Sequence, residues 1–159
     1  MTIRVGIGYD SHRFVSGRPL ILGGQTIPFD RGLAGHSDAD AVAHALIDAI
    51  LGAAGAGNIG QLFPDRDPQW KDADSLGLLR SACELVRGRG FLPRQADITV
   101  ITERPQLGPY LPAMAVALAV AAGIDPGCIG VKAKSNEGMG FLGRGEGLAV
   151  MAVATVEAR

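Results

Sequence analysis

All three histidines of the chain lie within its first 44 residues, close to several aspartates. Asp10 and His12 are two positions apart, directly after a segment that alternates like a β-strand, so both side chains are expected to point to the same side. A carboxylate and an imidazole are ligands that Zn²⁺ accepts, and three protein ligands would leave a fourth coordination position for a substrate. His36 and His44 flank the start of an expected helix. Either could supply the third ligand, and spacing alone does not choose between them.

The helix that contains His44 is expected from about residue 38 to residue 54. Apolar residues recur there at helical spacing, with Ser37 as a candidate N-cap and Asp40 at the third helical position. The free amides of the first turn, together with the positive end of the helix dipole, would attract a phosphate next to the metal. In the plainer alternative, Ser37 and Asp40 only cap the helix, Asp10 caps a turn, and the histidines bind nothing.

A second group of candidate residues lies in a glycine-rich segment from 132 to 147. Lys134, Ser135 and Arg144 are residue types that bind phosphate, and Glu137 suits Mg²⁺. Glycines that would let the backbone approach a ligand closely are found at positions 138, 140, 143, 145 and 147. The alternative interpretation is a mobile loop between two strands.

Signatures of several other functions are missing from the sequence. Gly6 and Gly8 begin like a dinucleotide-binding fingerprint, but Ser11 stands where the third glycine would be. The chain has no P-loop and no serine in a nucleophile elbow, and neither cysteine has neighbours typical of a reactive thiolate. Lys+Arg number 15 against 16 Asp+Glu, and the longest apolar stretch, 113–122, is too short to span a bilayer. We therefore expect no nucleic-acid partner and no membrane partner.

The length of 159 residues fits one domain, 1–159. The N-terminal residues read as a strand, starting at Met1, rather than as a signal peptide, and two isolated cysteines suit a reducing compartment, so we expect a cytoplasmic protein.

The last strand is apolar on both faces. Three helices can cover one face, and we expect another copy of the chain to cover the second. Periodicity predicts strands at 3–8, 97–102, 129–134 and 148–156, a hairpin at 20–27, and helices at 38–54, 75–87 and 112–122.

Four blocks occur in order along nearly the whole chain: Gly8-Tyr-Asp10-Ser-His12, Gly35-His36-Ser37-Asp38-Ala-Asp40-Ala-Val-Ala-His44-Ala-Leu, Leu62-Phe63-Pro64-Asp65 and Gly140-Phe141-Leu-Gly-Arg144-Gly-Glu146-Gly147. Together they resemble the 2-C-methyl-D-erythritol 2,4-cyclodiphosphate synthase family. The resemblance implies an enzyme of the non-mevalonate isoprenoid pathway that cyclises a CDP-linked methylerythritol 2-phosphate and releases CMP. It also implies an α+β fold with a small mixed β-sheet and helices packed on one face. The subunits would pack through the other face in a homotrimer, with active sites between neighbouring subunits.

The resemblance also implies roles for individual residues. His36 and Ser135 match positions that stabilise the transition state, with serine where the family usually has threonine. Glu137 matches a ligand of Mg²⁺ or Mn²⁺ that is held together with the substrate diphosphate. Three residues match the ligands of Zn²⁺, or of another divalent transition metal, in the family: Asp10, His12 and His44.

Two of the matched substrate-binding residues depart from the family pattern. Asn58 replaces an aspartate in the segment that holds the sugar of the nucleotide, and an amide would hold two hydroxyls differently. Gln106 replaces the commoner lysine, in a segment where the family binds cytosine largely through backbone groups. The complete matched set is Ser37, Asn58, Ile59, Gly60, Phe63, Pro64, Asp65, Arg66, Asp67, Thr102, Glu103, Arg104, Pro105, Gln106, Leu107, Gly108, Lys134, Asn136, Phe141 and Arg144.

The implied reaction accounts for the missing protein nucleophile, because the attacking group is the substrate's own 2-phosphate. Two other functions stay open at this point. A metal-dependent phosphohydrolase acting on a nucleotide diphosphate would use water and give an open-chain monophosphate. A binding protein with a purely structural metal would release no CMP. Phe141, Arg144 and Glu146 could also line a central cavity of the trimer that takes an isoprenoid diphosphate.

Overall fold

The computed structural model describes residues 2–159, so Met1, where the expected first strand starts, lies outside the described residues. One mixed five-stranded sheet has the order β4-β1-β7-β5-β6, in which only β5 and β6 run parallel. A hairpin of β2 and β3 forms a separate two-stranded sheet. The strands are β1 (Ile3–Val15), β2 (Leu20–Leu22), β3 (Gln25–Ile27), β4 (Gly32–Leu33), β5 (Phe91–Ile101), β6 (Ile129–Lys134) and β7 (Gly147–Ala158).

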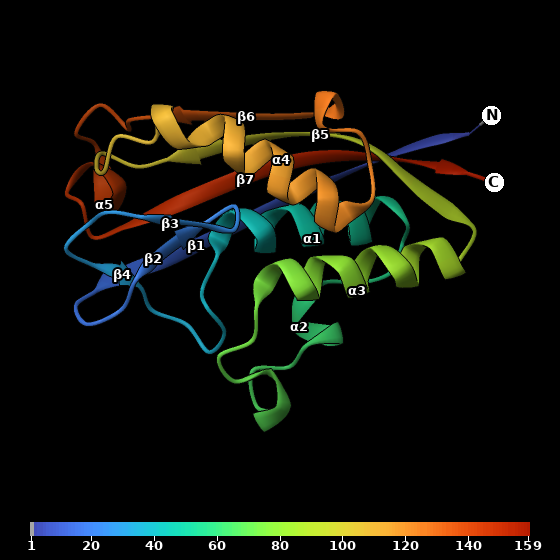
Figure 1. Ribbon diagram of the computed structural model, residues 1–159, viewed down its shortest axis with the longest axis horizontal. Helices are drawn as coiled ribbons and strands as arrows, with labels where there is room; N and C mark the ends of the chain where they lie inside the picture. The colour runs from blue at the N-terminus through green and yellow to red at the C-terminus, as the bar shows by residue number, and fades with distance from the viewer. Residues whose placement is uncertain (1) are drawn as a thin grey trace.

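Three longer helices, α1 (Ala41–Ala53), α3 (Ser75–Gly88) and α4 (Leu111–Ala122), pack on one side of this sheet (Figure 1). The mixed α+β fold with helices on one face is thus as expected, and α4 ends at Gly123 in the left-handed conformation. None of the helices within residues 2–159 has the length and apolar character needed to cross a bilayer. The short helical segments are α2 (Ile59–Leu62), α5 (Gly140–Gly143), η1 (Pro68–Trp70), η2 (Gly108–Tyr110) and η3 (Pro126–Cys128).

The start of α1 differs from the sequence-based expectation. Asp40, not Ser37, is the N-cap, and its carboxylate accepts hydrogen bonds from the amides of Val42 and Ala43. Ala39 has a φ of 58°, so the helix cannot extend back to residue 38. A phosphate at the first turn, as expected from the sequence, could not bind these two amides, because both already donate to the Asp40 carboxylate. The Ser37 hydroxyl instead accepts from the amide of Ala39 and lies 3.2 Å from Nε2 of His44.

The packing of α1 onto β1 depends on two glycines. A Cβ atom at Gly6 would lie 2.0 Å from the carbonyl oxygen of Ala49, and one at Gly8 would lie 1.9 Å from that of Ala45. Any side chain at these positions would push the helix away from the strand. Gly6 and Gly8 thus allow α1 to pack closely on β1. The contact at Ala45 also brings its neighbour in the helix, His44, close to β1.

The other face of the sheet is uncovered in the single chain. We call six residues the open sheet face, and they are Ile3, Val5, Ile7, Tyr9, Met151 and Val153. Each of these side chains is at least 43% exposed, whereas Val150 and Ala152 on the helix side of β7 are buried. The prediction that helices would cover only one side of β7 is confirmed. Exposed apolar patches of this kind are typical of interaction surfaces.

Candidate metal centre and substrate pockets

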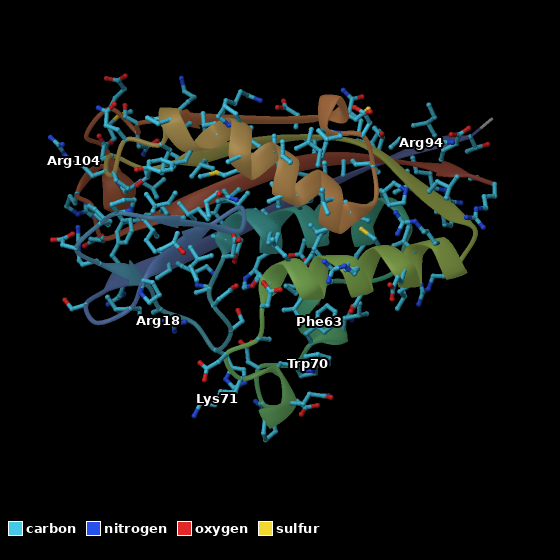
Figure 2. All side chains as sticks on the ribbon, viewed as in Figure 1. Arg18, Phe63, Trp70, Lys71, Arg94 and Arg104 are labelled. Carbon is cyan, nitrogen blue, oxygen red and sulfur yellow. The ribbon has the colours of Figure 1, made fainter. Side chains whose placement is uncertain are left out.

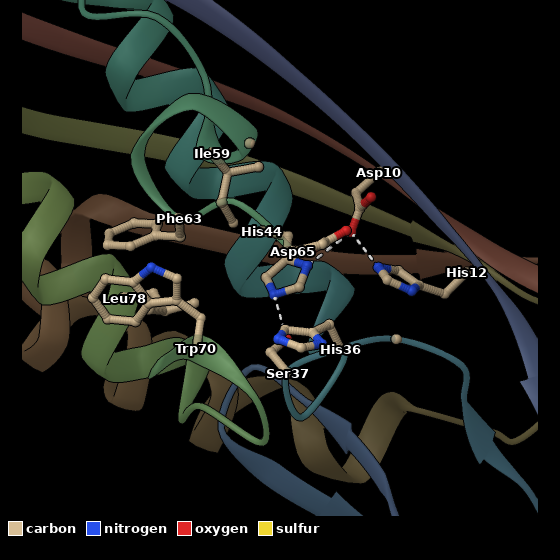
Figure 3. A pocket seen from close by; sticks show the side chains of 12 residues that line it. Asp10, His12, His36, Ser37, His44, Ile59, Phe63, Asp65, Trp70 and Leu78 are labelled. Carbon is tan, nitrogen blue, oxygen red and sulfur yellow. Dashed lines mark hydrogen bonds and ion pairs between the residues drawn. The ribbon is translucent and has the colours of Figure 1, made fainter. Parts of the chain in front are cut away.

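The structure brings Asp10, His12 and His44 together at one point between β1 and α1 (Figure 3). One ligand atom from each lies within 4.8 Å of the other two. The Asp10 Oδ2 atom is 2.8 Å from Nε2 of His12 and 3.3 Å from Nδ1 of His44. Of the two histidines that spacing left open, His44 is therefore the one that joins the pair on β1.

Both imidazoles use their outer nitrogen in a hydrogen bond. Nδ1 of His12 donates to the carbonyl oxygen of Ala34 at 2.6 Å, and Nε2 of His44 lies 2.9 Å from the hydroxyl of Ser75 and 3.2 Å from that of Ser37. Each ring then turns its other nitrogen toward Asp10. Metal-binding histidines characteristically have such an outer partner, which fixes the tautomer. The donor set therefore fits a divalent cation of the zinc type.

The charges at this point favour a cation as well. Burial raises the pKa of the Asp10 carboxyl, but the hydrogen bond from His12 and the closeness of the His12 and His44 imidazoles outweigh this effect and hold that pKa below its usual value. Burial lowers the pKa of His12, but the bond to Asp10, its negative charge and the Ala34 carbonyl together raise it. Both shifts favour the charged forms, a carboxylate at Asp10 and an imidazolium at His12, and a divalent cation can take the place of the proton between them.

Hydrogen bonds to Arg18 and to the backbone at Asp67 hold the loop that carries His36 and Ser37. The guanidinium of Arg18 donates to the carbonyl oxygens of Gly35 and Ser37 at 2.5 and 2.6 Å. Nε2 of His36 lies 3.4 Å from the carbonyl oxygen of Asp67, in the loop that closes the pocket. Both side chains are thereby held beside the metal centre without belonging to it.

A pocket, which we call the first pocket, opens from the metal centre toward α2 and η1. Phe63 and Trp70 lie on its apolar side, with ring centroids 5.0 Å apart in an edge-to-face arrangement (Figure 3). Five expected substrate-binding residues line it, namely Ser37, Ile59, Gly60, Phe63 and Asp65. Its other lining residues are Asp10, His12, Gly35, His36, His44, Trp70 and Leu78.

The remaining expected residues of this region are not among those that line the first pocket. Asn58 is the N-cap of α2, and its side-chain oxygen accepts from the amide of Gln61 at 3.0 Å. Asp67 caps η1 by accepting from the amide of Gln69. Pro64 and Arg66 are exposed on the same loop.

Sequence reasoning missed Trp70, Leu78 and Ser75 at this site. Trp70 is the only tryptophan of the chain, which is the one signal that could have drawn attention to it. Ser75 was expected only as the first residue of a helix, and Leu78 has the appearance of an ordinary core residue.

A second pocket lies between the segment after β5 and the end of β6. Its expected residues are Thr102, Glu103, Pro105, Gln106, Leu107, Gly108, Lys134 and Ser135, joined by Leu111 and Ala133. Arg104 and Glu137 are exposed and do not line it, and Glu137 has a φ of 53°. In Figure 2 Arg104 lies at the upper left edge of the molecule, whereas Phe63 and Trp70 lie below its centre. The second pocket shares no lining residue with the first.

The glycine-rich segment also forms part of a third pocket. Phe141 lines it together with Ser11, His12, Arg13, Glu146 and Gly147. Arg144 lies outside this lining, and its guanidinium is 3.3 Å from the carboxylate of Glu146.

Glu103 links the two loops of the second pocket. Its Oε1 atom accepts hydrogen bonds from the amides of Asn136 and Gly138 at 2.9 and 3.2 Å. We expect Glu103→Ala to leave both amides unpaired, so that they exchange with solvent about tenfold faster in an NMR hydrogen-exchange experiment. Glu103→Gln is the matched control, because both bonds end on one oxygen that an amide also provides. Equal exchange in the alanine variant would show that the loop is held by other contacts.

The fold and the site define an α+β protein with three potential metal ligands that line one pocket. The YgbB family model matches residues 3–157. The chain is 54% identical over 155 residues to the 2-C-methyl-D-erythritol 2,4-cyclodiphosphate synthase of Symbiobacterium thermophilum, which covers 98% of this chain and 99% of that one. This chain therefore belongs to the YgbB family.

Solved structures agree with this assignment. A 2C-methyl-D-erythritol-2,4-cyclodiphosphate synthase with CDP bound superposes with a TM-score of 0.88 at 41% identity, covering 97% of this chain and all of that one. The bifunctional IspDF of Campylobacter jejuni gives a TM-score of 0.95 at 43% identity and covers 99% of this chain. The present chain spans 43% of the length of that bifunctional protein.

Proposed function

We propose that the protein is a phosphorus–oxygen lyase of the non-mevalonate isoprenoid pathway. It converts 4-CDP-2-C-methyl-D-erythritol 2-phosphate into 2-C-methyl-D-erythritol 2,4-cyclodiphosphate and CMP. Membership of the YgbB family and full-length similarity to a synthase of that name support this assignment. The structural observation that carries it is the cluster of Asp10, His12 and His44 beside the first pocket.

The reaction exchanges one phosphorus–oxygen bond for another. An oxygen of the 2-phosphate forms a bond to the β-phosphorus. The bond between the β-phosphorus and the oxygen that joins it to the α-phosphorus breaks, and CMP leaves with this oxygen. The attacking group is already an anion, so the chain needs no nucleophile and no strong general base. Its tasks are to hold two mutually repelling phosphates together and to offset charge on the leaving group.

The chain supplies ligands for two cations in this proposal. Asp10, His12 and His44 would hold Zn²⁺ or another divalent transition metal, and Glu137 would share Mg²⁺ or Mn²⁺ with the substrate diphosphate. Bound cations supply Lewis acidity and neutralise phosphate charge. His36 and Ser135 donate hydrogen bonds to the phosphate oxygens on which charge develops, and Ser37 helps to orient the phosphate next to His36.

The pockets suit different parts of the substrate. The apolar side of the first pocket, formed by Ile59, Phe63, Trp70 and Leu78, fits the methyl-bearing carbon skeleton, and Asp65 can accept from its hydroxyl groups. The second pocket would take the cytidine, with Lys134 close to its phosphate. The other predicted substrate contacts are Asn58, Gly60, Pro64, Arg66, Asp67, Thr102, Glu103, Arg104, Pro105, Gln106, Leu107, Gly108, Asn136, Phe141 and Arg144.

One chain alone would hold an incomplete active site. His36 lines the first pocket and Ser135 lines the second, and the two pockets share no residue. We propose a homotrimer of single-domain chains, 1–159, in which the open sheet face packs against neighbouring copies. The first pocket of one subunit would then meet the second pocket of the next. The exposure of Ile7 and Tyr9 on that face supports this packing. A cytoplasmic location completes the proposal and agrees with two free cysteines.

The assignment is tested by incubating the protein with the CDP-linked substrate in the presence of Zn²⁺ and Mg²⁺. Phosphorus NMR should show a cyclic diphosphate and CMP formed in equal amounts. An open-chain product, such as the 2,4-bisphosphate formed with CMP when water attacks the β-phosphorus, would instead identify a phosphohydrolase, and intact substrate would identify a binding protein. Either of these results would overturn the proposed reaction.

Asn58 gives a specific prediction about nucleotide binding. Asn58→Asp keeps an oxygen to cap the Gln61 amide and offers a second, charged acceptor to the sugar hydroxyls. We expect the KM for the CDP-linked substrate to fall about fivefold, with kcat little changed, because a charge-assisted bond is stronger by about 1 kcal/mol. Steady-state kinetics of CMP release measures both constants. An unchanged KM would show that the amide serves as well as the carboxylate.

A further inference from the structure

We propose that Ser75 and Asp38 are positioning residues that set the tautomer of His44, so that its Nδ1 atom presents a lone pair to the metal centre. The inference rests on the proposed metal centre and extends it to Ser75, at the start of α3, and to Asp38, in the loop before α1. Neither side chain touches the three proposed ligand atoms around which the centre is built. They act through the outer nitrogen of His44.

The direction of the hydrogen bonds carries the argument. Ser75 is fully buried, and its hydroxyl has a single proton. The Asp38 carboxylate can only accept, so the Ser75 hydroxyl donates to its Oδ1 atom. The remaining lone pairs of that hydroxyl face Nε2 of His44 at 2.9 Å, and this nitrogen must therefore carry the proton. In the neutral imidazole of His44 the lone pair is therefore on Nδ1, 3.3 Å from the Asp10 Oδ2 atom, where a cation can bind both.

The Asp38 carboxylate is fixed in place by the backbone. Its Oδ2 atom accepts from the amide of Ser75 at 3.0 Å, and its Oδ1 atom accepts from the amide of Asp40 at 3.1 Å. The amide of Asp38 in turn donates to the carbonyl oxygen of Ala73 at 3.1 Å. These bonds tie the loop before α1 to the loop before α3, so the Ser75 hydroxyl has one orientation available to it.

The Ser75 hydroxyl does not cap α3, so helix capping does not account for a serine at this position. The N-cap of α3 is Asp74, whose carboxylate accepts from the amide of Leu76. The Ser37 hydroxyl is the other partner of His44, but it lies farther away, at 3.2 Å, and also accepts from the amide of Ala39. Because Ser37 has no carboxylate behind it, only the Ser75 hydroxyl is forced to accept from His44.

The test measures zinc affinity in the whole protein by competition with a chelator. We expect Ser75→Ala to weaken zinc binding about 10- to 100-fold, which is the usual effect of removing an outer partner of a metal-binding histidine. Ser75→Thr, which restores the hydroxyl, should recover most of the affinity. Ser81→Ala is the matched control, because it removes a serine hydroxyl from the same helix that bonds only to the carbonyl of Gly77, and it should bind zinc like the wild type.

Nitrogen NMR of the zinc-free protein tests the tautomer itself, at a pH well above the ordinary pKa of histidine. The wild type should hold His44 with its proton on Nε2, and Ser75→Ala should show a mixture of both tautomers. A wild-type His44 with its proton on Nδ1 would overturn the inference without recourse to any variant that could misfold. Wild-type zinc affinity in Ser75→Ala would also overturn it. If His44→Ala also kept its zinc, the metal centre itself would be wrong, which is a separate result.

Discussion

His44→Ala is expected to lower the zinc content from about one ion per chain to nearly none, and to reduce kcat/KM by more than about 10³-fold. Of the three proposed ligands, His44 comes from α1, and the other two, Asp10 and His12, lie on β1. Without it, the cation would keep a carboxylate and one imidazole, which is too few ligands for a stable site. Elemental analysis of the purified variant and an assay of CMP release measure the two effects.

His36→Ala is the control that separates metal binding from catalysis. His36 lines the first pocket but is not part of the metal cluster. It should keep its zinc while CMP release falls about 10²-fold, the usual loss for one donor to a developing charge. Full zinc content in His44→Ala would contradict the ligand set. Loss of zinc in His36→Ala would show that the two histidines had been assigned the wrong roles.

The sequence was sufficient for two of the three residues of the proposed metal centre. Asp10 and His12 are close along one strand, and the two-residue period of a strand alone places them on one side. The choice of His44 needed either the family resemblance or the structure, since it depends on how closely α1 approaches β1. That approach follows from the missing side chains of Gly6 and Gly8. A glycine pair in a strand gives no sign of which helix will pack against it.

The features that sequence reasoning missed share a physical cause. Ser37 and Asp40 are both good N-caps, and the left-handed backbone of Ala39 decides between them. Ser75 lies 37 residues from Asp38, and its bond to Asp38 exists only because two loops meet. Contacts set by tertiary structure leave no local pattern. The uncovered face of β7, in contrast, was predictable, because the local sequence shows that both faces of this strand are apolar and three helices can cover only one of them.

Ile7→Asp is expected to separate the proposed trimer into single chains, and to reduce CMP release at least 100-fold while zinc stays at about one ion per chain. Ile7 lies on the open sheet face, opposite Val153 of β7, and is 66% exposed in the single chain. The folded subunit can therefore accept a carboxylate there at little cost. In the assembly the same carboxylate would be buried without a partner, at a cost of several kcal/mol in each subunit. Light scattering coupled to gel filtration gives the mass.

Val120→Asp is the matched control, because Val120 is 68% exposed but lies on α4, on the opposite side of the sheet. It should leave the mass and the activity as they are. The combination expected of Ile7→Asp, in which zinc is kept and CMP release is lost, follows only if each active site needs two subunits, one giving His36 and the other giving Ser135. A separated variant that still released CMP at the wild-type rate would show that one chain holds a complete site.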